Sequence, residues 1–325
     1  MKSWFGRSKG ATSDRSELAR LTQQPLLDAE DIAALAAQAA DLVRARVRSQ
    51  VHDHHAGDWP SAWLGRGLDF EEARPYTQGD DMRDMDWRTT ARLGHPFVKI
   101  YREERQPMLH VVVDRGPAMR FGTRRRLKLA QAARVAALAA FAAAERNVAV
   151  GATLWDVADD DLLLPPRHDR AGILALVQAA AAPAPPLAME AAAAEHEADR
   201  LHRLAELPRG TRLLLASDFS WLDPSHEGHA HSLALLAELT DLLAVRISDP
   251  AERALPNVGR ARFQDIATGD IRWLDTASAA VRATHAAAFA ARRERIEALL
   301  SRAGVRWIDI GSEIDDLAPL LHGHG

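Results

Sequence analysis

The chain has 325 residues, of which 47% are hydrophobic and 26% charged, and its formal net charge at pH 7 is -4. This length supports one large domain or two modest ones, and the composition is typical of a globular protein. The small negative charge provides no basic field that would favour nucleic acid. The absence of cysteine excludes disulfides, thiolate metal ligands and a cysteine nucleophile.

The N-terminal residues predict neither a membrane span nor a secretory signal. No apolar window approaches the ~20 residues that a spanning helix needs. The basic start MKSWFGRSKG is not followed by an apolar core. We therefore expect a soluble, cytoplasmic protein. Residues 1–25 mix basic, Ser and Gly residues without periodicity, which predicts a disordered segment.

Residues 26–107 are expected to form a helix and a small β-containing segment. From Asp28 onward, apolar residues recur at helical spacing, with acidic residues at the start and arginines at the end, an order that suits the helix dipole. Residues 51–107 are rich in Gly, Pro and charged residues, and Phe97–Tyr101 is strand-like. This part is interpreted as a lead-in to the main domain.

Residues 108–325 alternate between strand and helix patterns. The expected strands are Leu109–Val113, Val148–Trp155, Arg212–Ser217, Leu242–Ile247 and Val305–Ile310. The expected helices are Arg125–Glu145, Arg170–Ala182, Glu190–Leu207, Ser232–Leu239 and Ala277–Ala303. Such alternation predicts an α/β domain with a doubly wound, mostly parallel sheet. Within it, Ala261–Asp275 has the pattern of a hairpin.

Three of the expected strands end in aspartate, at Asp114, Asp218 and Asp249. In a parallel sheet these ends share one edge, where ligands bind in open α/β folds. Two or three carboxylates there could hold a hard divalent cation. The alternative is that each aspartate caps the helix or loop that follows it.

The segment RGLDFEEARPYTQGDDMRDMDWRTTARLGHPFVKIYREE, followed by a strand and later by LLLASDFSW and RISDPAERALPNVG, resembles the bacterial domain-of-unknown-function family 58. The most specific part of the motif is Gly79, Asp80, Asp81, Arg83, Asp86 and Trp87. Members of that family resemble von Willebrand factor A domains and are typically encoded beside MoxR-type AAA+ ATPases. The resemblance therefore implies an A-domain-like sheet and a MoxR-type partner.

The A-domain resemblance also implies a metal-ion-dependent adhesion site, with Asp-x-Ser-x-Ser in its first loop, a Thr in its second and an Asp in its third. Here Gly116 and Ala118 stand at the two hydroxyl positions, and only Asp114 and Asp218 match. Because Mg²⁺ demands near-ideal octahedral ligands, two aspartates and water would hold it weakly. The expectation is a degenerate metal site.

Basic residues gather just after Asp114, around the start of the next expected helix. One hypothesis is that arginine replaces the missing metal and pairs with an acidic partner. The residues expected at this contact surface are Arg115, Arg120, Arg124, Arg126 and Asp249. The alternative is a solvated surface whose arginine stems cover apolar area.

Two further clusters are interpreted as structural. The acids of Gly79–Trp87 alternate with arginines, which favours a salt-bridged network, with Trp87 as its packing anchor. The His52–His55 run has ligand residues at tight spacing, but short runs of this kind are typical of exposed loops.

No nucleophile or nucleotide-binding motif is present in the sequence. The absence of such motifs favours a binding function, and the family resemblance implies a non-catalytic adaptor for a MoxR-type AAA+ ATPase, acting in remodelling, maturation or metal insertion of a client complex. Two alternatives stay open. One is a metal-dependent hydrolase using Asp114, Asp218 and the His52–His55 cluster, and the other is an interaction domain whose metal site has decayed.

Overall fold

The structure is a computed structural model that describes residues 24–50, 72–77, 82, 85–100, 108–156, 161–184, 195–222, 227–264, 270–318 and 320. The helices are α2 (Ala29–Gln50), α4 (Trp87–Leu93), the 3-10 helix η2 (Pro117–Arg120), α5 (Lys128–Ala144), α6 (Arg170–Ala181), α7 (Glu195–Leu204), α8 (Glu227–Leu239), α9 (Pro250–Arg253) and α10 (Ala279–Arg302). The strands are β1 (Glu72–Pro75), β2 (Phe97–Ile100), β3 (Met108–Asp114), β4 (Ala149–Trp155), β5 (Leu162–Arg167), β6 (Arg212–Ser217), β7 (Asp241–Ser248), β8 (Arg260–Gln264), β9 (Ile271–Asp275) and β10 (Arg306–Gly311).

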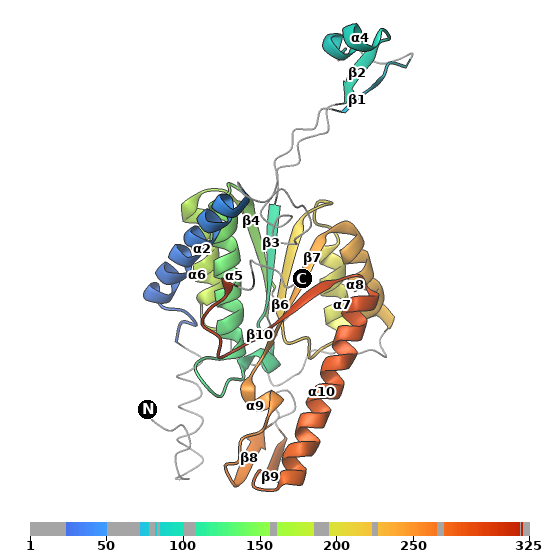
Figure 1. Ribbon diagram of the computed structural model, residues 1–325. Helices are drawn as coiled ribbons and strands as arrows, with labels where there is room; N and C mark the ends of the chain where they lie inside the picture. Colours follow the sequence, from blue (N-terminus) through green and yellow to red (C-terminus); the bar gives the residue numbers. More distant parts are fainter. Residues whose placement is uncertain are drawn as a thin grey trace.

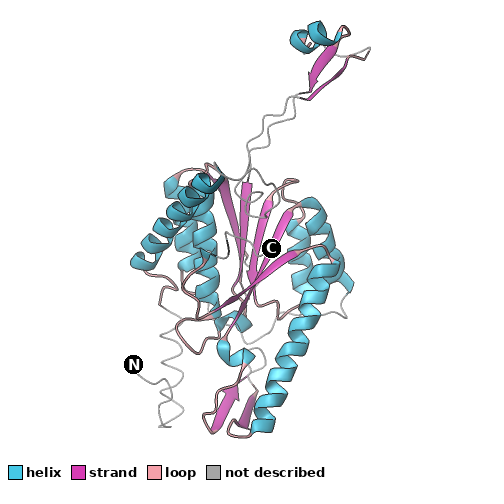
Figure 2. Ribbon diagram, in the orientation of Figure 1, coloured by secondary structure: helices cyan, strands magenta, loops and turns pink. Residues whose placement is uncertain are grey.

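A six-stranded sheet with the order β10-β7-β6-β3-β4-β5 forms the centre of the main body (Figures 1 and 2). Five of the strands are parallel, and β5 pairs antiparallel with β4 at the edge. Parallel pairing requires crossover connections, which the intervening helices provide. The predicted mixed α/β class with a mostly parallel sheet is confirmed.

Helices cover both faces of this sheet. Helices α2, α5 and α6 pack on one face and α7, α8 and α10 on the other, as Figure 1 shows on the left and right. On strand β3, Val111 and Val113 point to the first layer and Val112 to the second. A strand buried on both faces is apolar throughout, which explains why the sequence pattern identified it.

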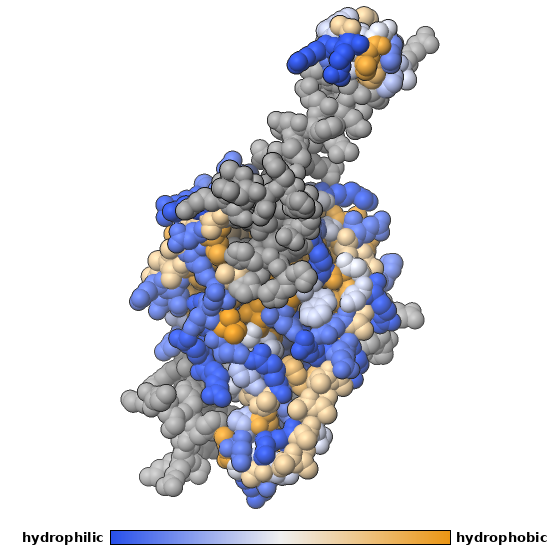
Figure 3. All heavy atoms as spheres, in the orientation of Figure 1, coloured by the Kyte–Doolittle hydropathy of each residue, from blue (hydrophilic) through white to orange (hydrophobic). Residues whose placement is uncertain are grey.

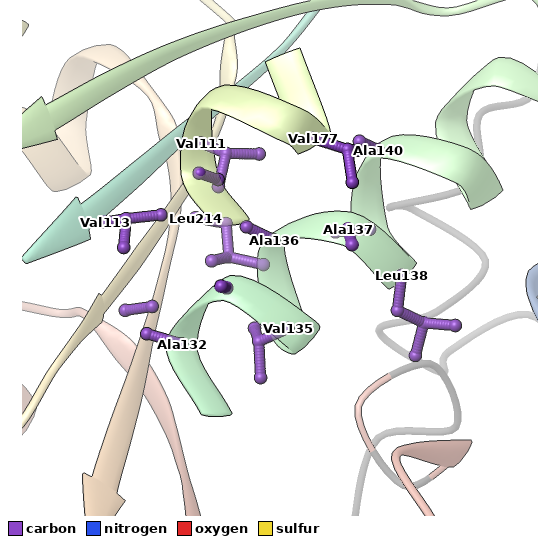
Figure 4. Packing of buried hydrophobic residues seen from close by; sticks show 14 of the residues in the cluster. Val111, Val113, Ala132, Val135, Ala136, Ala137, Leu138, Ala140, Val177 and Leu214 are labelled. Atoms are coloured by element: carbon purple, nitrogen blue, oxygen red, sulfur yellow. The ribbon is translucent and has the colours of Figure 1, made fainter. Parts of the chain in front are cut away.

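Helix α5 is the most deeply buried helix of the first layer. Its alanines, among them Ala132 and Ala136, contact Val111 and Leu214 of the sheet, and Val177 of α6 lies beside Ala140 (Figure 4). Small side chains allow the helix to lie close to the sheet, so that α2 can pack over it. Leu35, 1% exposed, places α2 in the same core as β3.

Strand β5 was missed by the sequence analysis. Its segment Leu162–Arg167 contains Pro165 and Pro166, and proline cannot donate to a sheet ladder. An edge strand tolerates this because one side of it is unpaired, and the register with β4 shifts between Val150 and Ala152. The position of β5 at the edge of the sheet therefore allows a strand where the two prolines locally favour a loop.

Strands β8 and β9 form the expected antiparallel hairpin, with Arg260 opposite Asp275. Ile271 and Trp273 of this hairpin are 51% and 58% exposed. On the face shown in Figure 3, hydrophilic and apolar residues of the described part are interspersed.

Strands β1 and β2 pair antiparallel, and α4 lies between them in the sequence. Asp86 caps α4 by accepting hydrogen bonds from the backbone N–H groups of Arg88 and Thr89, and Gly94 ends the helix at a φ of 77°. Trp87 is 64% exposed, so the expectation that it anchors packing is wrong. Gly79, Asp80, Asp81 and Arg83 lie outside the described residues.

Candidate functional site: the carboxyl edge of the sheet

Three aspartates stand at the carboxyl ends of neighbouring parallel strands. Asp114 ends β3, Asp218 follows β6 and Asp249 follows β7. Since these strands are parallel and adjacent, all three residues lie at one edge of the sheet, as the sequence predicted. The structure gives each of them a different set of partners.

Asp114 is turned into the protein and 6% exposed. Its Oδ2 accepts a hydrogen bond from Ser217 Oγ at 2.5 Å, and its Oδ1 accepts one from the Gly116 backbone N–H at 2.8 Å. Burial, together with the negative charge of Asp218, raises the pKa of Asp114 to about 6. A Cβ at position 116 would lie 2.9 Å from Asp114 Oδ1, so a serine there would require the carboxylate to shift.

Lys128, the first residue of α5, has a fully buried side chain. Its Nζ donates to Asp218 Oδ2 at 2.7 Å and to Glu252 Oε1 at 2.6 Å. Burial acts to lower the pKa of Lys128, but the two carboxylates outweigh it and hold that pKa above its ordinary value. Burial likewise acts to raise the pKa of Asp218, and the Lys128 ammonium reverses this, so that the carboxyl stays ionised. One ammonium thus lies between two carboxylates. We call these three residues, Lys128, Asp218 and Glu252, the Lys128 cluster.

The residues at this edge do not fit a divalent cation. Both oxygens of Asp114 and both of Asp218 are hydrogen-bonded inside the chain, and an ammonium already neutralises Asp218. Gly116 and Ala118 offer no hydroxyl ligand. In the part of the chain that the structure describes, no group of three or more His, Asp or Glu side chains is arranged to hold a metal ion. Among the described residues, Lys128 is the cation that pairs with Asp218 and Glu252.

Asp249 is fully buried and joins three elements. It accepts hydrogen bonds from the hydroxyl and backbone N–H of Thr123, from Ser312 Oγ at 2.8 Å and from the Ala251 backbone N–H at 2.9 Å. The last bond caps α9, where Glu252 completes a capping box. These bonds hold the pKa of Asp249 below its ordinary value in spite of burial. The expectation that Asp249 lies on a contact surface is wrong.

Arg115 also faces inward and is 4% exposed. Its Nε lies 3.0 Å from Asp156 Oδ1, and its guanidinium donates to the Pro183 carbonyl at 2.8 Å. Arg120 is half-buried beside it and donates from Nε to the Arg115 carbonyl at 3.4 Å. Arg115 therefore holds the β3–η2 turn to neighbouring loops, and its predicted role as a surface contact is wrong.

Arg126 fastens the start of α5 to the segment after β10. Its guanidinium donates to the Ile314 carbonyl at 2.9 Å and to Asp315 Oδ1 at 2.5 Å. Arg124 is exposed and has no hydrogen bond or ion pair with any described residue. Of the arginines expected to meet a partner, Arg124 alone is placed free at the surface of the described structure.

The loop after β6 is held in a strained form. Phe219 has a φ of 55°, which is unusual for a bulky residue and costs on the order of 1–3 kcal/mol. Its fully buried ring and the hydrogen bond from its backbone N–H to Ser217 Oγ, at 2.9 Å, keep it there. Trp221 Nε1 donates to the same hydroxyl at 3.0 Å. The loop thus positions both Ser217 against Asp114 and Asp218 against Lys128.

Lys128 belongs to the basic cluster that follows Asp114 in the sequence, but its pairing with Asp218 was not predicted, nor were Ser217 and Glu252 as members of the site. The available signal was a single lysine at the start of an Ala-rich helix, in a chain with three strand-end aspartates.

The His52–His55 run lies outside the described residues. Among the described helices, none is long and apolar enough to span a membrane.

The fold and this edge define a mixed α/β protein whose strand-end carboxylates are bonded within the chain. Residues 72–295 match the model of the family described as "Protein of unknown function DUF58". This match covers more than half of the chain, and the protein belongs to that family.

Two relatives are similar over most of their length. Uncharacterized proteins of Mycobacterium tuberculosis (strain ATCC 25618 / H37Rv) and Mycobacterium bovis are each 29% identical over 290 residues, covering 86% of this chain and 84% of theirs.

Solved structures with partial likeness include an aerotolerance-related membrane protein from Bacteroides fragilis, with a TM-score of 0.43 and 12% identity over 66% of this chain and 94% of that one. Another is the conserved hypothetical protein BatB from Bacteroides thetaiotaomicron, with a TM-score of 0.39 and 12% identity over 63% and 90%. Neither likeness says what this chain binds.

Proposed function

We propose that this protein is a non-catalytic, cytoplasmic adaptor that works with a MoxR-type AAA+ ATPase. Its role would be to present a client complex for remodelling, maturation or metal insertion. The ATPase partnership follows from the family resemblance. The mostly parallel sheet, covered on both faces, and the adjacent strand-end positions of Asp114 and Asp218 support a von Willebrand factor A-like domain as the binding module.

The observation that carries the non-catalytic part of the proposal is that donors of the chain itself engage every carboxylate oxygen of the carboxyl edge. Both oxygens of Asp114, Asp218, Asp249 and Glu252 accept hydrogen bonds from within the chain. A general base must lie within reach of its substrate, and Asp114 and Asp249 are buried. These carboxylates stabilise the loops of the edge, which suits a rigid binding surface better than a hydrolase site.

A pull-down tests this proposal. The tagged full chain is incubated with lysate of its native host in parallel samples with ATP, with ADP, without nucleotide and with EDTA. Recovery of a MoxR-type ATPase, identified by mass spectrometry and then reproduced with the two purified proteins, supports the adaptor function. Because the edge carries its own ammonium, binding without nucleotide should survive EDTA. Failure of the purified ATPase to bind under every condition would refute the adaptor function.

A further inference from the structure

A pocket of about 390 Å³ lies beside the Lys128 cluster, between the end of β7, α9 and one face of α10. Asp218 and Glu252 line its inner side, and Phe289, Arg292 and Arg295 line it from α10. Residues three and four apart lie on the same side of a helix, so these three α10 residues present one continuous stripe. The volume is at the lower end of ligand pockets, which suits one or two side chains rather than a cofactor.

The pocket contains guanidinium groups with unused donors. Arg246 bonds Asp309 and Glu297 through Nε and Nη2, and Arg292 donates from Nη2 to the Ser220 carbonyl at 2.7 Å. The Nη1 group of each has no partner among the described residues, and Arg295 has no described partner at all. These guanidinium groups line the pocket, and its two lining carboxylates, Asp218 and Glu252, are already engaged by Lys128.

The charges around the pocket do not cancel. The Lys128 cluster carries a net charge of about -1, from two carboxylates and one ammonium. Arg246 and Arg293 are offset by Glu297 and Asp309, to which they are paired. Two arginines of α10, Arg292 and Arg295, remain without a counter-charge. This outer rim favours an anion, whereas the inner carboxylates disfavour one of high charge.

An apolar wall accompanies the arginines. Phe289 is half-buried and Ile296 is 4% exposed, and both line the pocket together with Ile247. The buried Nδ1 atom of His285, another lining residue, has no hydrogen-bond partner in the described part of the chain. A glutamate side chain, with an aliphatic stem and a singly charged head, matches this combination of apolar wall and arginine rim.

We propose that this pocket binds a carboxylate side chain from an acidic segment of a protein partner. The inference rests on the proposed binding function and adds to it the chemistry of the partner. Arg292 and Arg295 hold the carboxylate by charge-assisted hydrogen bonds, Arg246 supplies a further donor, and Phe289 and Ile296 cover the stem.

The test measures the binding of a fluorescein-labelled oligoglutamate peptide to the full chain by fluorescence anisotropy at low ionic strength. In the Arg292→Ala/Arg295→Ala variant we expect the Kd to rise about tenfold or more, which corresponds to about 1.4 kcal/mol or more. The matched control is Arg170→Ala/Arg302→Ala, which removes two exposed arginines outside the pocket and changes the net charge equally. Its Kd should change less than about twofold.

Two further arms keep the result unambiguous. Arg295→Glu alters a residue without a described partner, so it should fold normally and still weaken binding. Inorganic phosphate is added as a competitor to separate a phosphate site from a carboxylate site. Equal loss of affinity in the pocket and control variants would overturn the proposal, as would the absence of peptide binding or displacement of the peptide by equimolar phosphate.

The peptide-binding test of the pocket and the ATPase-binding test of the adaptor function can fail independently. If the purified ATPase binds Arg295→Glu as tightly as the wild type, the pocket is not its contact, although the adaptor function stands. If the ATPase never binds but the peptide does, the adaptor function fails and the pocket remains a carboxylate site.

Discussion

Lys128 is the residue on which the carboxyl edge depends for its charge balance. Its ammonium has no exposure to solvent, and its two partners have side chains that are 10% and 29% exposed. Replacing the lysine by methionine keeps most of the apolar stem but leaves Asp218 and Glu252 facing each other without a counter-charge. Removal of one partner from a buried ion pair is strongly destabilising because the remaining charge is not compensated.

We therefore predict that Lys128→Met lowers the free energy of unfolding by about 3 kcal/mol. Urea unfolding followed by circular dichroism measures this change. The control is Arg125→Met, which removes a cation whose side chain is 62% exposed and paired with Asp315. That exposed pair should contribute less than about 1 kcal/mol. Similar costs for the two variants would contradict a structural role for the buried ammonium.

Asp114 makes the free energy of unfolding depend on pH, and the direction of that dependence follows from its raised pKa. Burial and the nearby Asp218 charge raise its pKa from 3.8 to about 6 in the folded protein. A folded state that binds the proton more tightly than the unfolded state is favoured at low pH. The stability that Asp114 contributes is therefore fully present below its unfolded pKa and is lost as the pH rises through its folded pKa.

The prediction is that the free energy of unfolding of the wild type falls, relative to that of Asp114→Asn, as the pH rises from about 4 to about 6. Urea titrations of both proteins across this range give the difference directly. Both proteins retain Asp218 and Asp249, so the opposite contributions of those carboxylates largely cancel. A difference that stays constant with pH would show that the Asp114 pKa is not raised.

Among the elements, the turn from β7 into α9 is the junction of the carboxyl edge. Asp249 connects α9 to the loop before α5 and to the end of β10. Hydrogen bonds to a charged group contribute about 1.5–3 kcal/mol each, and their loss leaves buried donors unpaired. One aspartate thus fixes the relative positions of three segments.

We expect Asp249→Ala to destabilise the protein by about 3 kcal/mol, measured by chemical unfolding. Asp169→Ala provides the comparison, since Asp169 is exposed and caps α6 through one bond to the Gly172 backbone N–H. Loss of that single cap should cost about 1 kcal/mol. If Asp249→Ala cost no more than Asp169→Ala, the bonds to Thr123 and Ser312 would contribute little.

On the scale of the whole molecule, α2 completes the layer that covers one face of the sheet. It lies before residue 72, where the family match begins, yet Leu35 and Ala39 are 1% and 0% exposed in the main core. Arg134 of α5 lies 3.6 Å from Asp31 of α2 and adds an ion pair across the helix contact. The expected boundary at residue 107 stays a prediction, but α2 packs with the domain that follows it.

Leu35→Ala should therefore lower the free energy of unfolding by about 3 kcal/mol, through lost burial and a residual cavity. Thermal and urea unfolding would both report it. Leu174→Ala is the matched change at a leucine that is 38% exposed on α6, and it should cost less than about 1 kcal/mol. Equal effects would mean that α2 is only loosely attached.

The elements themselves were largely predictable because their signals are local. Apolar runs gave β3, β6 and β7, and helical spacing gave α5 and α10, within a few residues of the observed ends. Strand β5 was not predicted, because Pro165 and Pro166 argue for a loop unless the strand lies at an edge. Trp87 was misjudged because aromatic residues are usually buried, whereas here the ring is exposed.

The sequence by itself determined the alternation of most strands and helices of the main domain and the shared edge of Asp114, Asp218 and Asp249, since periodicity and parallel pairing depend on nearby residues and on general rules of connection. Only the tertiary structure decided what those carboxylates meet. Lys128 reaches Asp218 across 90 residues and Glu252 across 124, and no local pattern records which cation will enter a buried site. Packing of α5 against the sheet brings that ammonium to the edge, and the low polarity of the interior then makes the pairing obligatory.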